Sequence, residues 1–262
     1  MAKGSNGRIK FYNDFTAPPG GITTGVPDAL FQNLGGGVGL IGVNEGVLAL
    51  TVDEPGGVIS ITTDTGDNDN HCLVAGAFKP SDGGFWMETR LKIGSVAATK
   101  VACFVGFTET LSAATPVMPA ETATVTTTYN GTGGMAGFVF DSDATSIKWR
   151  FVAGDGGAAL ATSNAEHGTG TAGGAIGIDA AATITADKYW LFRLVMTPDG
   201  ICRGYFGDAD NNKQLKFVGR NTSALGTGDN FHAIALIENR DANAEVMEVD
   251  YFEGEAYRNW AP

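Results

Sequence analysis

Short runs of apolar residues, alternating with polar ones or continuous, recur along this chain. About fourteen such runs, each roughly six to ten residues long, are separated by turn sequences such as EPGG and TPDG. Alternation is typical of β-strands, because successive side chains point to opposite faces of a sheet. The chain is therefore predicted to be an all-β jelly-roll sandwich of two antiparallel sheets. The runs are 8–15, 38–43, 46–52, 57–63, 72–78, 85–94, 101–109, 135–141, 147–153, 189–196, 201–207, 214–219, 231–238 and 245–253.

Composition also favours strands over helices. The 262 residues include 38 glycines and 9 prolines, and only 18% are charged, whereas long helices need repeats rich in Ala, Glu, Lys, Leu and Arg. Segments 110–134 and 154–188 interrupt the strand pattern and are rich in Gly, Ala and Thr, so we expect long loops there. We expect a single domain, 8–255, between a flexible arm, 1–7, and a tail, 256–262.

Charge and apolar content argue against several classes of partner. The formal net charge of −12 opposes binding to nucleic-acid phosphates. No segment reaches the roughly 18 apolar residues of a membrane-spanning helix, and no apolar stretch follows the N-terminal basic residues as in an export signal. We therefore expect neither nucleic acid nor membrane as a partner. Cys72, Cys103 and Cys202 lie in apolar runs without CxxC spacing and are expected to be buried free thiols.

Four runs of the sequence resemble, in the same order, virion proteins of tailed bacteriophages that have a concanavalin A-like lectin/glucanase jelly roll. They are FKPSDGGFWMETRLKIGSVAATKVACFVGFTET, GMAGFVFDSDATSIKWRFVA, YWLFRLVMTPDGICRGYFGD and EVMEVDYFEGE, and they cover most of residues 70–255. The resemblance implies a protein that decorates and cements the outer capsid surface, usually as a homotrimer bound to the major capsid protein across neighbouring capsomers. It also implies no catalysis and no cofactor, with assembly in the cytoplasm of the bacterial host.

Under the capsid interpretation, contacts are expected in the two long loops and at both chain ends. The N-terminal dozen residues form the only locally basic stretch of an acidic chain, and a basic arm suits an acidic partner surface. Aromatic residues beyond the last strand can anchor an interface. The candidate interface residues are Lys3, Arg8, Lys10, Tyr129, Tyr257 and Trp260.

The sequence EVMEVDYFEGE near the C-terminus contains ExDxxE, the spacing with which laminarinase-type β-glucanases carry their catalytic carboxylates on one strand. As an enzyme, the chain would use Glu248 as nucleophile and Glu253 as acid/base, with Asp250 between them. On a regular strand Glu253 points to the face opposite Glu248. Only a bulge, expected at Tyr251/Phe252, would restore a common face.

The position of this motif favours a strand without catalysis. Only nine residues follow Glu253, whereas in the glucanases the motif lies in the middle of the chain. Trp86, Trp149, Trp190 and Trp260 are scattered in the sequence and do not form an evident sugar platform. We therefore expect no enzyme. The main alternative to the capsid role is a carbohydrate-binding module or tail-associated adhesin, since the same fold serves sugar binding, with Trp149 as the test residue.

Two turn sequences, TGDNDNH and GDADNN, concentrate the oxygen ligands that calcium prefers, but neither has the spacing of an EF-hand loop. Asp64, Asp67 and Asp69 are the weak calcium candidates, and an ordinary turn is the other interpretation. The sequence GTGTAG matches GxGxxG without a preceding strand or a following helix, so it does not predict a dinucleotide site. The histidines lack HExxH spacing, and no cofactor is expected.

Overall fold

The structure, a computed structural model, describes residues 7–15, 32–35, 38–42, 47–51, 57–111, 118–123, 126–145, 147–160, 162–163, 176–177, 184–210 and 214–258. The candidate interface residues Lys3 and Trp260 lie outside these ranges. Within the described ranges the helical structure is one 3-10 turn, η1 (Pro80–Asp82). None of the described helical structure is long and apolar enough to cross a membrane.

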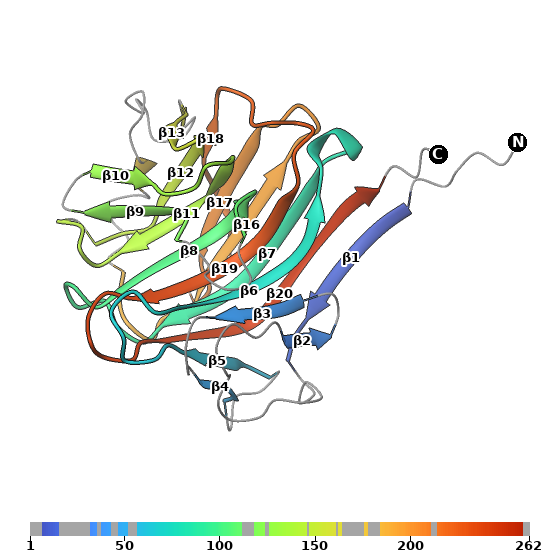
Figure 1. Ribbon diagram of the computed structural model, residues 1–262. Coiled ribbons are helices and arrows are strands. Elements are labelled where there is room, and N and C mark those ends of the chain that lie inside the picture. The colour runs from blue at the N-terminus through green and yellow to red at the C-terminus, as the bar shows by residue number, and fades with distance from the viewer. Residues whose placement is uncertain are drawn as a thin grey trace, which may run out of the picture.

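Two large antiparallel sheets form the body of the protein (Figure 1). In sheet A, strand β20 has a central place: it pairs with β7 on one side, and on the other its first part pairs with β5 and its second part with β1. The order of sheet A is β14 (Thr162–Ser163), β18 (Lys216–Asn221), β17 (Cys202–Asp208), β16 (Trp190–Met196), β7 (Phe85–Ile93), β20 (Val246–Arg258), β5 (Ile59–Thr62) and β4 (Val47–Leu50), with β1 (Gly7–Asn13) beside β20.

Sheet B lies in front of sheet A in the view of Figure 1. Its order is β13 (Ala158–Ala159), β12 (Arg150–Asp155), β11 (Met135–Asp141), β8 (Val101–Thr108), β19 (Phe231–Asn239), β6 (Asn70–Phe78), β3 (Val38–Gly42) and β2 (Gln32–Gly35), with β15 (Ile176–Gly177) beside β12. A hairpin of β9 (Ala120–Ala123) and β10 (Thr126–Tyr129) forms a third, two-stranded sheet and packs against β11.

The core lies between the two sheets and follows from the alternation in the sequence. On β7 every second side chain from Phe85 to Ile93 is buried, and the side chains between them are half-buried. Trp149, which is fully buried, joins the sheets: its ring centroid lies 5.4 Å from that of Phe140 on β11 and 4.6 Å from that of Phe192 on β16. Trp149 is therefore a core residue, and its use as the test residue for glycan binding on an exposed face was wrong.

The fold class predicted from the sequence is confirmed, because the described chain consists of antiparallel strands in a two-sheet sandwich and each predicted run contains a strand. The three cysteines are buried and free, as predicted. Three details differ from the expectation. The segment 110–134 contains the β9–β10 hairpin, the segment 154–188 contains the short strands β13, β14 and β15, and β20 continues to Arg258.

Candidate functional site

Strand β20, which carries the ExDxxE carboxylates, contains a bulge. Val249 and Tyr251 pair with consecutive residues of β7, so Asp250 between them is an extra residue. One extra residue reverses the inward and outward alternation beyond it. Glu248 and Glu253 consequently both lie on the outer face of sheet A, the face turned away from the core. The bulge occurs one residue earlier than the position considered from the sequence.

The irregular backbone of the bulge is satisfied by Thr89 on β7. The Thr89 hydroxyl donates a hydrogen bond of 2.7 Å to the carbonyl oxygen of Tyr251. Thr89 is fully buried and occupies an inward position between apolar neighbours. A backbone carbonyl without a partner at this depth would cost free energy, so this hydroxyl stabilises the geometry that brings the carboxylates to one face.

Charged side chains on the outer face of sheet A form a network of ion pairs. Every carboxylate on β7 and β20 except that of Glu253 forms an ion pair with an arginine or lysine. The pairs are Glu88–Arg193 (2.7 Å), Glu248–Lys92 (3.0 Å), Asp250–Arg90 (2.7 Å), and Glu255 with Arg8 (3.1 Å) and Lys10 (3.6 Å).

Glu253 differs from these carboxylates. Its side chain is half-buried and makes no hydrogen bond or ion pair with any residue that the structure describes. It lies directly opposite Glu88 on β7. Burial, followed by the charge of Glu88, raises the pKa of Glu253, while Arg193 and Lys10 act in the other direction. Among the described carboxylates of β7 and β20, that of Glu253 is therefore the one available to a ligand.

Tyrosine rings lie among these charges. The hydroxyl of Tyr251 donates a hydrogen bond of 2.7 Å to Glu88, and burial together with this carboxylate raises the pKa of Tyr251. The guanidinium carbon of Arg90 lies 4.0 Å from the ring centroid of Tyr189. The Tyr189 hydroxyl in turn donates to Glu248 at 3.4 Å. Aromatic and charged groups thus hold one another in fixed positions.

A pocket of about 300 Å³ opens on this face. One wall is apolar and comes from β16 and the segments at the end of β17 and the start of β18, and the other wall is polar and comes from β7 and β20. The lining residues are Leu191, Ala209 and Leu215 on the apolar side and Glu88, Arg90, Asp250 and Tyr251 on the polar side. Such a combination suits a small ligand that has both an apolar face and hydroxyl groups.

The outer face of sheet B, in contrast, is closed. Its apolar side chains form a second cluster in which every buried member is at most 4% exposed, including Phe104 on β8 and Leu236 on β19. The β9–β10 hairpin segment contributes Met118 and Ala120 to this cluster, and Tyr129 packs against it. Where its side chains are described, this face is therefore a second core covered by the hairpin.

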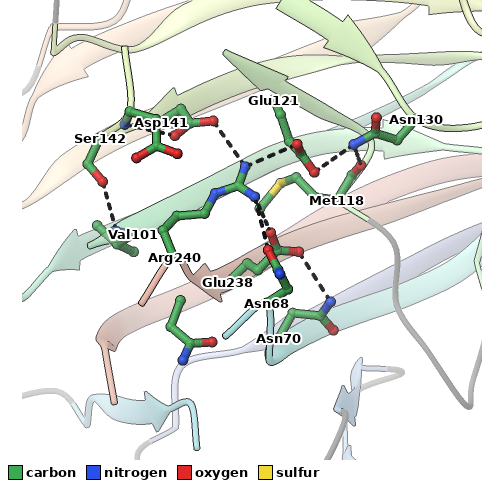
Figure 2. Close-up of polar contacts among 12 residues, drawn as sticks. Asn68, Asn70, Val101, Met118, Glu121, Asn130, Asp141, Ser142, Glu238 and Arg240 are labelled. Atoms are coloured by element: carbon green, nitrogen blue, oxygen red, sulfur yellow. Dashed lines mark hydrogen bonds and ion pairs between the residues drawn. The ribbon is translucent and has the colours of Figure 1, made fainter. Parts of the chain in front are cut away.

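An ion network fastens the hairpin to sheet B (Figure 2). The guanidinium of Arg240, just after β19, lies 3.5 Å from Glu121 on β9, 3.0 Å from Asp141 on β11 and 2.7 Å from Glu238 on β19. Asp141 also accepts a hydrogen bond of 2.8 Å from the backbone N–H of Thr122. Burial raises the pKa of Glu238 to about 7, although Arg240 acts in the other direction. We interpret this network as structural, because it is buried and links three elements.

The calcium candidates lie in a tight turn before β6. Asp69 is buried, and its carboxylate accepts a hydrogen bond of 3.1 Å from the backbone N–H of Gly66. The backbone carbonyl of Asp64 accepts a hydrogen bond of 3.1 Å from Asn239. Asp67 is exposed. The described part of the chain brings no three His, Cys, Asp or Glu side chains together in a metal-binding arrangement, and these contacts are those of a turn.

The structure brings some of the candidate interface residues together. Arg8 and Lys10 on β1 share Glu255, and the guanidinium carbon of Arg8 lies 5.2 Å from the ring centroid of Tyr257. These residues lie on β1 and on the adjacent end of β20. Tyr129 lies elsewhere, at the hairpin over sheet B. β1 and the adjacent end of β20 thus form one partly exposed surface, here called the chain-end surface, and the hairpin tyrosine does not belong to it.

Sequence reasoning missed most of the pocket. The alternation in FWMETRLKI places Glu88, Arg90 and Lys92 on one face of a strand, and this signal could have suggested partners for the carboxylates of β20. The pairing register and the bulge decide which residue meets which. Both depend on contacts between segments about 160 residues apart, such as that between Arg90 and Asp250.

Comparison with known proteins identifies the fold. No family model matches the chain, and no curated protein matches its sequence. A protein of unknown function, SO2946 from Shewanella oneidensis MR-1, is similar in structure, with a TM-score of 0.58, 12% identity, and coverage of 98% of this chain and 90% of that one. Peanut lectin in complex with a 9mer peptide has a TM-score of 0.52 and 8% identity, with coverage of 95% and 97%. The Ca²⁺-bound exoplasmic/lumenal domain of VIP36 has a TM-score of 0.50 and 9% identity, with coverage of 95% and 90%. The chain thus has the concanavalin-like jelly roll of legume-type lectins.

Proposed function

We propose that this protein binds carbohydrate without catalysis and that the outer face of sheet A is its binding surface. The observation that carries the proposal is the pocket between Leu191 and Tyr251, which is lined both by apolar side chains and by polar groups that hold one another in ion pairs and hydrogen bonds. A sugar ring has apolar C–H faces and a rim of hydroxyl groups, so it can pack on the apolar wall while Arg90 and Asp250 exchange hydrogen bonds with its hydroxyls. The lectin-like fold supports the same assignment.

The ion pairs on this face favour binding over hydrolysis. Retaining hydrolysis needs one carboxylate free to attack the sugar and a second, protonated one to assist the leaving group. Glu248 is tied to Lys92 and Tyr189, and Asp250 is tied to Arg90. Release of reducing sugar from β-1,3- and β-1,4-glucans should stay at the level of the blank. Turnover that disappears in Glu248→Gln would contradict the non-catalytic assignment.

A glycan array probed with the purified chain tests the proposal, with two serine variants of the same strand as a matched pair. Tyr251→Ser removes a pocket wall and should weaken binding about tenfold or more, the effect of losing one aromatic contact and its hydrogen bond. Tyr257→Ser removes an exposed tyrosine outside the pocket and should bind as the unmodified chain does. Binding to no glycan, or equal binding by Tyr251→Ser, would contradict the proposal.

We propose, as a second candidate, that the chain assembles on a virion surface, with the chain-end surface of β1 and β20 as the contact to a capsid protein. The observation that favours it is the grouping of Arg8, Lys10, Tyr12 and Tyr257 there, with Tyr12 52% and Tyr257 41% exposed. Exposed tyrosines beside arginine are typical of interface centres. This second proposal includes the homotrimeric state and the location on the outer capsid surface that were expected from the sequence.

Electron microscopy of phage particles prepared with and without the protein tests the second candidate. Added density on the capsid, lost when Tyr12 and Tyr257 are both replaced by serine, is the expected result. Particles that look identical with and without the protein would contradict it. The pocket depends on Tyr251 and the particle contact on Tyr257, so the Tyr251→Ser and Tyr257→Ser variants separate glycan binding from particle binding.

A further inference from the structure

A single row of outward side chains crosses five strands of sheet A. Successive cross-strand neighbours in this row are Tyr12 on β1, Glu253 on β20, Glu88 on β7, Arg193 on β16 and Tyr205 on β17. Side chains opposite one another on adjacent strands have Cβ atoms roughly 5 Å apart. The row is therefore continuous, and it passes through the pocket at Glu88.

Charge in this row is unbalanced at one position. Glu88 is neutralised by Arg193 at 2.7 Å and receives a hydrogen bond from Tyr251. Glu253, its direct neighbour, has no such partner among the described residues. Tyr12, on the other side of Glu253, donates its hydroxyl to Asp14 at 3.2 Å and leaves its ring half-exposed. A half-buried carboxylate beside an aromatic ring thus remains without an ion-pair partner among the described residues.

We propose that Glu253 and Tyr12 bind the ammonium group of an amino sugar that belongs to an oligosaccharide held in the adjacent pocket. This inference rests on the proposed carbohydrate-binding function and specifies its ligand class. An ammonium group forms a charge-assisted hydrogen bond with the carboxylate and a cation–π contact with the ring. A neutral hydroxyl gains less from the same carboxylate, because its hydrogen bond carries no ionic contribution from the donor.

The pocket lies at a suitable separation for a second sugar ring. Tyr251 lines the pocket and Glu253 follows two positions later on the same face, roughly 7 Å along the strand. Glu88 connects the pocket with the Glu253 position, since it lines the pocket and lies opposite Glu253 on the neighbouring strand. One ring in the pocket and an amino-substituted ring beside it would therefore contact a continuous surface.

The experiment must separate this site from general attraction, because a chain of net charge −12 attracts any cationic oligomer. Glu253→Gln and Glu255→Gln each remove one negative charge from the outer face of β20. Glu255 already pairs with Arg8 and Lys10, so its change is the matched control. Calorimetric titrations would use a glucosamine oligomer and its fully N-acetylated counterpart of equal length, at about pH 6, where the amine is largely protonated.

The expected result is that the glucosamine oligomer binds the unmodified chain more tightly than the acetylated one does. Glu253→Gln should weaken that binding about tenfold and leave the acetylated oligomer unaffected. Glu255→Gln should change neither affinity by more than about twofold, because salt in the buffer weakens the attraction between the oligomer and a charge outside its binding site. Thermal unfolding of both variants near that of the unmodified chain would show that they are folded.

Equal affinity for the two oligomers, or equal losses in the two glutamine variants, would overturn the inference and leave the proposed glycan binding intact. Failure of both oligomers to bind also overturns it. The glycan array then decides how far the failure reaches. Binding to other glycans would keep the proposed carbohydrate-binding function, whereas binding to no glycan would overturn that function as well.

Discussion

At the scale of single residues, one threonine sets the geometry of the candidate site. The inward positions of β7 are apolar except for Thr89, whose hydroxyl satisfies the carbonyl oxygen of the bulge at Tyr251. A lone polar residue in a buried row needs a hydrogen-bond partner, and here the carbonyl oxygen at the bulge accepts that bond. Without the bulge, Glu253 would point into the core instead of standing beside the pocket.

Replacing Thr89 by valine should lower the free energy of unfolding by about 1–3 kcal/mol, because the isosteric side chain leaves a buried carbonyl without its donor. Thr89→Ser keeps the hydroxyl and should lower the free energy of unfolding by less than the valine variant does. Urea denaturation of the three proteins measures the difference. Equal stability of the valine variant and the unmodified chain would mean that the hydroxyl does not support the bulge.

Trp149 gives a second prediction at this scale. Its ring packs between Phe140 of sheet B and Phe192 of sheet A, so Trp149→Ala should lower the free energy of unfolding by about 3–5 kcal/mol. Trp86→Ala, on the outer face, should cost less because that side chain is only half-buried. Denaturation midpoints in the reverse order would contradict the core assignment of Trp149.

At the scale of elements, the β9–β10 hairpin is held over sheet B by buried charge. Arg240 joins it to Asp141 and Glu238, and the apolar cluster below remains closed to solvent. The sequence did not predict this hairpin, because its Ala and Thr residues lack the apolar alternation that identified the other strands. Strand positions were predictable from local periodicity, whereas the hairpin contacts and the β20 bulge depend on distant segments.

The buried carboxylate of this network should make stability depend on pH. The pKa of Glu238 is about 7 in the fold and about 4.3 in an unfolded chain. The stabilisation linked to its proton is therefore fully present below about pH 4.3 and is lost as pH rises through about 7. Relative to Glu238→Gln, the unmodified chain should lose roughly 2–3 kcal/mol between about pH 4.5 and pH 8.

Urea denaturation of both proteins at several pH values measures this difference. Comparison with the glutamine variant isolates Glu238 from the other titrating groups. A difference in the free energy of unfolding that stays constant with pH would contradict the raised pKa and the burial that causes it.

At the scale of the whole molecule, the two outer faces of the sandwich differ, although sheet A also has a small buried apolar cluster beside the pocket. The outer face of sheet B is apolar and closed, while that of sheet A carries paired charges, tyrosines and the pocket. The fold class could be predicted from strand periodicity and turns. Which face is open could not, because that depends on what the hairpin covers and on the register of β20 against β7.

Amide chemical shifts, recorded by NMR during titration with the tightest-binding oligosaccharide from the array, locate the sugar-binding surface residue by residue. If the outer face of sheet A binds the sugar, the shifts should concentrate on β7, β16 and β20 around Glu88, Arg90 and Tyr251, with the hairpin strands β9 and β10 unchanged. Shifts centred on the hairpin and sheet B, or no shifts at saturating oligosaccharide, would contradict it.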